Sequence, residues 1–161
     1  MAIIFPNSSI EGLDSSINIK NHVVQFVDYT TTVNTTATTS AWVNIMTNSI
    51  TTIKAGNRIL VEYMCNHRND YAQAAWCLSY HRMLMSCTEA GITNSQVMYS
   101  GHMGAASLYI GFYERQFMVT AATKGTYSFT ASVLAHQGTI WVGTYNSGST
   151  NHYLRLYEIG S

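Results

Sequence analysis

The sequence predicts an all-β fold, a β-sandwich or jelly roll of about eight or nine antiparallel strands. Two observations carry this prediction. Short segments rich in Val, Thr and aromatic residues alternate apolar and polar positions with a period of two, as strands with one buried face do. Breaks that contain Gly or Asn separate these segments, and no segment shows the periodicity of a long helix. Strands are therefore expected to make up most of the chain.

The strand candidates begin at residue 22 and follow one another to residue 159. The nine segments are 22–29, 30–40, 41–47, 57–66, 73–86, 107–120, 126–136, 139–145 and 152–159. The first is rich in Val and aromatic residues. The second is dominated by Thr, which suits a strand but specifies its register weakly. No internal repeat or second domain is evident, so we interpret all nine as strands of one domain.

Alternation within three of these segments predicts which side chains share a face of a sheet. In 57–66, Ile59, Val61, Tyr63 and Cys65 lie on one face, and Leu60, Glu62 and Met64 lie on the other. In 73–86, Trp76, Leu78 and Tyr80 lie opposite Cys77, Ser79 and His81. In 126–136, one side carries Tyr127, Phe129, Ala131 and Val133. The Ala, Leu and Met content of 72–87 also fits a helix, but the period-two spacing of Trp76, Leu78 and Tyr80 favours a strand.

Residues 1–21 differ from the rest and are expected to form an N-terminal arm, more extended than helical. Apolar residues at positions 10, 13 and 17 would also fit one or two helical turns. The candidate partner-binding residues of the arm are Ile3, Ile4, Phe5, Ile10 and Leu13. In an isolated protomer many of these side chains would be exposed to water. We therefore expect the arm to dock on another protein, or to fold back on its own oligomer.

Composition excludes several classes of protein. Hydrophobic residues make up 47% of the chain, which excludes a disordered chain, and no apolar run is long enough for membrane insertion as a helix. The net charge is +0, so nothing electrostatic indicates nucleic-acid binding. Only 10% of residues are charged and 12% are aromatic, a combination that favours a protomer hidden against copies of itself. The odd number of Cys residues, 3, and the lack of a signal peptide indicate cytoplasmic synthesis.

No catalytic residues are expected, and the chain is predicted not to be an enzyme. It lacks phosphate-binding glycine loops, metalloprotease motifs and nucleophile elbows. Glu62 and Glu114 could face one another on neighbouring strands, as a glycosidase would require. Three arginines, Arg58, Arg82 and Arg115, are equally available as partners, so we interpret the two carboxylates as members of structural ion pairs.

One cluster has the residue types of a metal site. Cys65 and His67 could converge with Cys77 and His81 on a zinc ion if their strands pair. The spacing does not match a tight CxxC knuckle, and the alternative is that the cysteines are small buried hydrophobic residues. No metal and no cofactor is expected. A second alternative concerns aromatic pairs: Tyr153 with Tyr157, or Trp141 with Tyr145, could form a sugar-binding platform, although packing in the core or at a subunit interface is favoured.

The order of features from about residue 22 to residue 159 resembles small β-domains of tailed-phage virion proteins, jelly rolls akin to the C1q and tumour-necrosis-factor fold. The segments that carry this resemblance are 22–29, the Thr-rich segment 30–40, Trp42-Val43-Asn44-Ile45, Ser49-Ile50-Thr51, 55–62 and 153–159. The resemblance covers most of the chain and brings no set of functional residues with it. It implies a jelly-roll domain at 22–161, a homotrimer and a place on a virion.

Two functions follow from the resemblance. Only about twenty residues precede the domain, which favours a small trimeric capsid decoration (cement) protein that binds the major capsid protein or another virion protein. The alternative is a tail-fibre or tail-tip adhesin that recognises glycans of the host surface. The expected location is the virion, on the capsid surface or the tail, after synthesis in the host cytoplasm. The number of copies per particle would distinguish the two functions.

Overall fold

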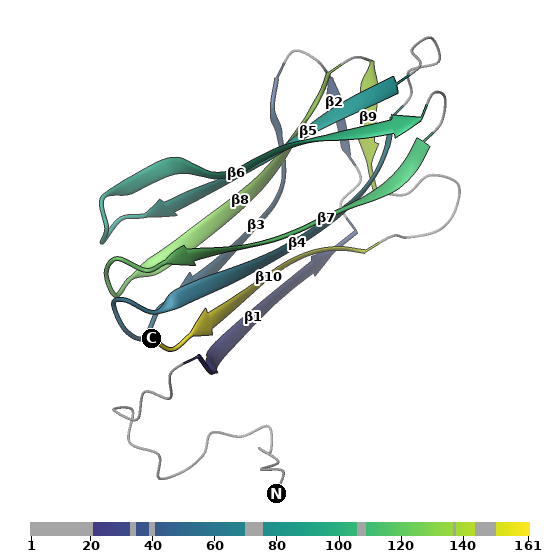
Figure 1. Cartoon of the computed structure of the whole chain (residues 1–161). Coiled ribbons are helices and arrows are strands. Elements are labelled where there is room, and N and C mark those ends of the chain that lie inside the picture. The colour runs from purple at the N-terminus through teal and green to yellow at the C-terminus, as the bar shows by residue number, and fades with distance from the viewer. Residues whose placement is uncertain are drawn as a thin grey trace, which may run out of the picture.

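Ten strands form two antiparallel sheets that pack face to face (Figure 1). The structure, a computed structural model, describes residues 21–32, 35–38, 41–69, 76–105, 109–136, 138–143 and 151–161. Sheet A contains β1 (Val23–Thr31), β2 (Thr35–Thr38), β4 (Arg58–Asn69), β7 (Tyr109–Thr120), β9 (Thr139–Val142) and β10 (His152–Ile159). Sheet B contains β3 (Val43–Thr51), β5 (Trp76–Cys87), β6 (Ile92–Ala105) and β8 (Thr126–Ala135). These described ranges contain no helix, and so none that could cross a membrane.

The order of the strands is that of a jelly roll. In sheet A, β9 and β10 lie end to end along the same edge of β4, and β2 and β1 lie end to end beside them. Counting each end-to-end pair once, the ten strands occupy eight positions, ordered 1-8-3-6 in sheet A and 2-7-4-5 in sheet B. Position 1 therefore pairs with 8, 2 with 7, 3 with 6 and 4 with 5, which is the pairing of two Greek keys in a jelly roll. The predicted jelly-roll β-sandwich is confirmed.

The core lies between the sheets and uses the faces that alternation predicted. The buried side chains of β4 are Ile59, Val61, Tyr63 and Cys65, and those of β8 include Tyr127, Phe129, Ala131 and Val133. Leu154 and Leu156 of β10 complete the sheet A side of this core. Each large apolar side chain buried here stabilises the fold by about 1.5–3 kcal/mol before the entropy of ordering is deducted.

The sequence prediction missed one strand, β6. It placed no strand between residues 87 and 106, and it interpreted 91–94 as a break between strands, whereas β6 begins at Ile92. The strand lies at the edge of sheet B and pairs with β5 alone. Two register shifts interrupt that pairing, between Met83 and Leu84 and between Met85 and Cys87. Because a shift moves side chains to the opposite face, the period-two pattern is lost in a strand that is already rich in Ser, Gly and Asn.

The predicted arm lies largely outside the described residues. Ile3, Ile4, Phe5, Ile10 and Leu13 all belong to residues 1–20, so the structure does not test their role. The description begins at Asn21, whose backbone N–H donates to the carbonyl of Gly160 at 2.8 Å. The arm therefore joins the domain beside the end of β10.

A buried carboxylate ties three segments together at the same end of the sandwich. Glu158 of β10 is fully buried. Its oxygens accept hydrogen bonds from the Ile53 backbone N–H at 2.9 and 3.1 Å, from Asn57 Nδ2 at 2.6 Å, and from Gln25 Nε2 of β1. A buried carboxylate is stable in a folded protein only with such donors. Glu158 thus fixes the loop between β3 and β4 against both β1 and β10.

Candidate functional site

Three rows of side chains cross the outer face of sheet A, each with one residue from β1, β10, β4 and β7 in that order. The rows are Phe26, Tyr157, Leu60 and Met118; Asp28, Arg155, Glu62 and Gln116; and Thr30, Tyr153, Met64 and Glu114. We call these twelve residues the sheet A grid. Its middle row is polar, and the apolar first row ends in two well-exposed side chains, Phe26 and Met118. The grid is the richest mixture of aromatic and carboxylate groups on the described surface.

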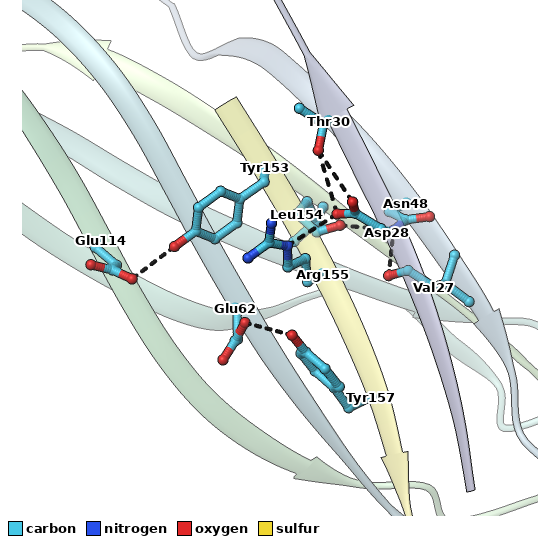
Figure 2. A network of polar contacts seen from close by, with 10 residues as sticks. All are labelled: Val27, Asp28, Thr30, Asn48, Glu62, Glu114, Tyr153, Leu154, Arg155 and Tyr157. Carbon is cyan, nitrogen blue, oxygen red and sulfur yellow. Dashed lines mark hydrogen bonds and ion pairs between the residues drawn. The ribbon is translucent and has the colours of Figure 1, made fainter. Parts of the chain in front are cut away.

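Tyrosine hydroxyls of β10 donate to the carboxylates of the grid (Figure 2). Tyr153 donates to Glu114 Oε1 at 2.7 Å, and Tyr157 donates to Glu62 Oε2 at 2.8 Å. Arg155, which lies between them on β10, forms an ion pair with Asp28 at 3.2 Å, and its guanidinium lies 4.2 Å from the centre of the Tyr153 ring. The polar groups of the grid therefore satisfy one another across four strands.

These carboxylates correct the sequence-based expectation of arginine partners. Glu62 receives its hydrogen bonds from Tyr157 and from Gln116 Nε2, not from a guanidinium. The three arginines contact other groups. Arg58 donates to Asn21 Oδ1, Arg82 lies 4.4 Å over the Trp42 ring, and Arg115 donates to the Tyr113 hydroxyl and to Ser100. Sequence spacing could not foresee this, because the tyrosines that compete for the carboxylates come from the C-terminal strand.

The grid raises the pKa of both phenols. Desolvation, together with the hydrogen bond and negative charge of Glu114, raises the pKa of Tyr153 to about 12. Desolvation and the Glu62 carboxylate likewise raise the pKa of Tyr157. Both phenols therefore remain protonated donors at neutral pH, and neither has the low pKa of an activated nucleophile or base.

The Tyr153 phenol gives a pH-dependent prediction. Its pKa is about 12 in the folded chain against an ordinary value of 10.0, so folding favours its protonated form. The resulting stability is fully present below about pH 10 and is lost as the pH rises through about 12. We expect ultraviolet difference absorbance to show several late-titrating tyrosines, one of which, Tyr153, is lost in Tyr153→Phe. Glu114→Gln should move this titration toward pH 10, and a late titration unchanged in both variants would contradict the assignment.

Asn48 belongs to the same network and links the two sheets by hydrogen bonds, so we call it the clip. From β3 of sheet B its Nδ2 donates to the carbonyl of Leu154 at 2.8 Å and to that of Val27 at 3.4 Å (Figure 2). These carbonyls lie on β10 and β1 of sheet A. The clip holds the β1 edge of the sandwich closed, and it positions the strands that carry the grid.

The predicted sugar platform of Tyr153 and Tyr157 lies on the surface, so packing of these rings in the core is excluded. Both rings already have partners within the chain. Phe26 stacks on Tyr157 with ring centres 4.7 Å apart, and Arg155 lies against the ring of Tyr153. For the other predicted pair, Trp141 is exposed on β9, and Tyr145 is outside the described residues. The Tyr153–Tyr157 pair therefore does not present two uncommitted rings side by side.

The candidate zinc cluster is only partly brought together. Its strands do not pair as the prediction required, because β4 lies in sheet A and β5 in sheet B. His67 and His81 nevertheless lie close together between the sheets, with ring centres 5.1 Å apart, and Cys65 is buried on the same strand as His67. The Cys77 side chain is outside the described part of the chain. Burial raises the pKa of the Cys65 thiol to about 12, which opposes the thiolate form that binds zinc. No group of three or more His, Cys, Asp or Glu side chains within the described residues is arranged to hold a metal ion.

These buried groups form a hydrogen-bonded chain across the core. The Tyr63 hydroxyl lies 3.0 Å from His81 Nδ1, and the Ser79 hydroxyl lies 3.3 Å from His81 Nε2 and 3.2 Å from His67 Nε2. Burial raises the pKa of Tyr63 well above its ordinary value, so its phenol stays protonated beside His81. The Ser79 hydroxyl bridges the two imidazoles. The ring of Tyr113 stacks on His81 at 3.9 Å and shields the chain from water.

Edge strand β1 carries four exposed apolar side chains, distributed over both of its faces, which we call the β1 edge patch. Its members are Val23, Val24, Phe26 and Tyr29, between 37% and 56% exposed. One side of β1 pairs with β10, and the order of sheet A places no described strand on the other side. An apolar edge strand without cover invites pairing with another chain. This patch is therefore a candidate surface for protein–protein contact.

A second surface cluster was missed by the sequence prediction. On the outer side of sheet B, Trp42, Tyr80, Arg82, Tyr99 and His136 come together from four separate segments, and we call them the ring cluster. One signal was available, since alternation placed Tyr80 on the face opposite Ser79 and His81. Tyr99 could not be included, because it lies on the strand that the prediction missed.

Comparison with known proteins gives a likeness of fold. No family model and no curated protein matches the chain. A structure of infectious bursal disease virus, Gx strain, aligns with a TM-score of 0.41 and 9% identity, over 86% of this chain and 38% of the viral chain. The VP2 subviral particle of the same virus aligns with a TM-score of 0.41 and 9% identity, over 93% of this chain and 41% of that one. This chain is thus similar, at a distance, to part of a viral chain more than twice as long as the aligned region.

Proposed function

We propose that this chain is a non-enzymatic virion structural protein that works by assembling with copies of itself and with another virion protein. The observation that carries the proposal is the β1 edge patch, four exposed apolar side chains on one edge strand of a jelly roll. The chain also has few charges with which to keep a monomer soluble. The carboxylates and phenols of the sheet A grid are occupied with one another, which supports a structural role for them.

The β1 edge patch is the surface on which the protomers of a homotrimer meet. Phe26 is half exposed and already stacks on Tyr157, so a neighbouring protomer would cover a preformed pair of rings. Aromatic side chains are enriched at such interfaces, and charged side chains are depleted from their centres. A trimer also requires the patch of each protomer to contact a different surface of the next, as closed rings do.

Phe26→Glu is the variant that tests self-association. A carboxylate at the centre of the interface would be desolvated without a partner, so light scattering should change from trimer to monomer at micromolar concentration. Ser95→Glu adds the same charge to the exposed edge strand β6 of the other sheet, and this control should remain a trimer. A wild-type monomer, or a Phe26→Glu protein that is still trimeric, would refute the assignment.

The finer proposal is capsid decoration, with the arm as the docking element. The apolar residues of the arm precede the domain, and burying four or five of them would supply about 1.5–3 kcal/mol each before ordering costs. Many copies on one particle would then add their contacts by avidity. Deleting residues 2–12 should leave a folded trimer that no longer binds the parent capsid or tail. Loss of the trimer itself, or unchanged binding to virions, would show that the arm is not the dock.

The alternative is a tail-fibre or tail-tip adhesin for host glycans. The observation that favours it is the ring cluster, because aromatic rings with polar neighbours suit sugar recognition. The copy number per particle separates the two: decoration requires hundreds of copies, and a tail tip a few dozen at most. Quantitative mass spectrometry of purified virions would provide that number.

A further inference from the structure

The ring cluster is a surface on which aromatic faces lie next to one another. Tyr80 and Tyr99, on neighbouring strands β5 and β6, stack with ring centres 5.6 Å apart and planes 22° from parallel. The Trp42 ring stands edge-on to Tyr99 at 6.2 Å, and the ring of Tyr99 is 54% exposed. Tyr99 thus forms an aromatic floor that is open to solvent, with Tyr80 stacked against it and the Trp42 ring at its edge.

Polar groups border this floor. The Arg82 guanidinium lies 4.4 Å over the Trp42 ring. On the other side, His136 is exposed and its Nδ1 lies 3.3 Å from the Tyr80 hydroxyl. Hydrogen-bond donors and acceptors thus surround an apolar centre, which is the usual make-up of a small-ligand site.

The sheet around the cluster is almost without charge. Apart from histidines, the four strands of sheet B contain one ionisable charged residue, Arg82. Its outer face instead carries paired hydroxyls, Thr47 with Thr130, Ser49 with Ser128 and Thr51 with Thr126. A polyanion such as nucleic acid would require several cations here. A neutral ligand rich in hydroxyl groups matches this surface.

We propose that the ring cluster binds a carbohydrate, with one pyranose unit lying on the exposed face of Tyr99. A pyranose presents a patch of C–H groups on one face, which packs on an aromatic ring, and hydroxyls around its rim. The rim hydroxyls would meet Arg82 and His136, and the edge of Trp42 would limit how far the sugar slides. The inference does not depend on the proposed self-association, because the β1 edge patch lies on sheet A and the ring cluster on sheet B.

A second copy of the chain is the competing occupant. Tyr, Trp and Arg are also enriched at protein interfaces, but Ser is depleted there, and hydroxyl side chains dominate this sheet around the rings. Protein interfaces moreover bury about 800 Å² on each partner, whereas the ring cluster is a local group of five side chains. The dimensions therefore favour a ligand of one or a few sugar units.

The test uses the full chain on an array of immobilised oligosaccharides of glucose, galactose, mannose and N-acetylglucosamine. Uronate-containing oligomers form a separate arm, which reports whether Arg82 selects an acidic sugar. The tightest binder is then titrated in solution while tryptophan fluorescence is followed. We expect Tyr99→Ala to weaken binding about tenfold or more, and Tyr99→Phe to retain most of it. Trp42→Phe should remove the fluorescence change, and Met118→Ala, an exposed apolar residue of sheet A, should bind like the wild type.

Three results would overturn the inference. One is the absence of binding to any oligosaccharide on the array. Another is binding that Tyr99→Ala leaves unchanged. The third is light scattering in which Tyr99→Ala dissociates the oligomer, because the ring cluster would then be a contact between copies. The Phe26→Glu protein, measured on the same array, separates failure of self-association from failure of sugar binding.

Discussion

Replacing Glu158 with Ala is expected to lower the free energy of unfolding by about 3–5 kcal/mol, one of the two largest effects of any substitution proposed for this protein. The carboxylate is fully buried, and its hydrogen bonds come from Gln25, Ile53 and Asn57. Removing it leaves these donors without their acceptor in a site that water does not reach. For a chain of this length, the loss corresponds to a decrease in Tm of about 10 °C or more.

Glu158→Gln tests whether the expected loss of stability comes from hydrogen-bond donors left without an acceptor. The amide has nearly the shape of the carboxylate, but its nitrogen donates, and the groups around it also donate. We therefore expect Gln to destabilise the protein almost as much as Ala does. Glu114→Gln, on the exposed face of sheet A, is the matched control and should cost less than about 1 kcal/mol. Thermal unfolding of Glu158→Gln at the wild-type temperature would contradict this account.

Ser79→Ala is the second substitution with a large expected effect. The Ser79 hydroxyl bridges His67 and His81 in the core, so its removal takes a partner from two buried imidazoles at once. We expect a loss of about 2–3 kcal/mol in chemical denaturation. Ser132→Ala is a suitable control, because Ser132 is equally buried and its hydroxyl donates one hydrogen bond, to Asn44. It should cost about 1 kcal/mol.

The same series of buried hydrogen bonds predicts coupling between two substitutions, Tyr63→Phe and Ser79→Ala. Tyr63→Phe removes the hydrogen-bonding partner of His81 Nδ1, at the opposite end of this hydrogen-bonded series from His67. Because Tyr63 and Ser79 bond to the same imidazole, the double variant should lose less stability than the sum of the two single variants. Strict additivity, or a Ser79→Ala protein no less stable than Ser132→Ala, would mean that the hydrogen bonds are not linked through His81.

Alternation alone was enough to predict the buried faces of β4 and β8. Every second side chain is buried from Ile59 to Cys65 in β4 and from Tyr127 to Val133 in β8, and Ser132, beside a register shift in the pairing of β8 with β3, is buried as well. The bounds of β10 also agree with the predicted segment 152–159. Period-two patterning is a local property, so it can be read wherever one face of a strand is buried and the other is not.

The partners of each side chain were decided by the tertiary structure. His67 and His81 were expected to approach on paired strands, but they meet across the core from opposite sheets. Glu62 and Glu114 were expected to form ion pairs with arginines, but they accept hydrogen bonds from tyrosines of β10. These tyrosines are close to them only because β10, the last strand, lies between β1 and β4. No spacing along the chain encodes such a long-range neighbour.

The sequence by itself therefore determined that this protein is a jelly roll with a sparsely charged, aromatic-rich surface. The tertiary structure alone decided which aromatic residues gather where. Tyr99 joins Tyr80 and Trp42 only because the irregular edge strand β6 pairs with β5. The physical reason is that burial of one face imposes a period-two pattern on each strand separately, and this pattern can be read from the sequence. A cluster on the outer face instead depends on the register between strands, which local patterning does not encode.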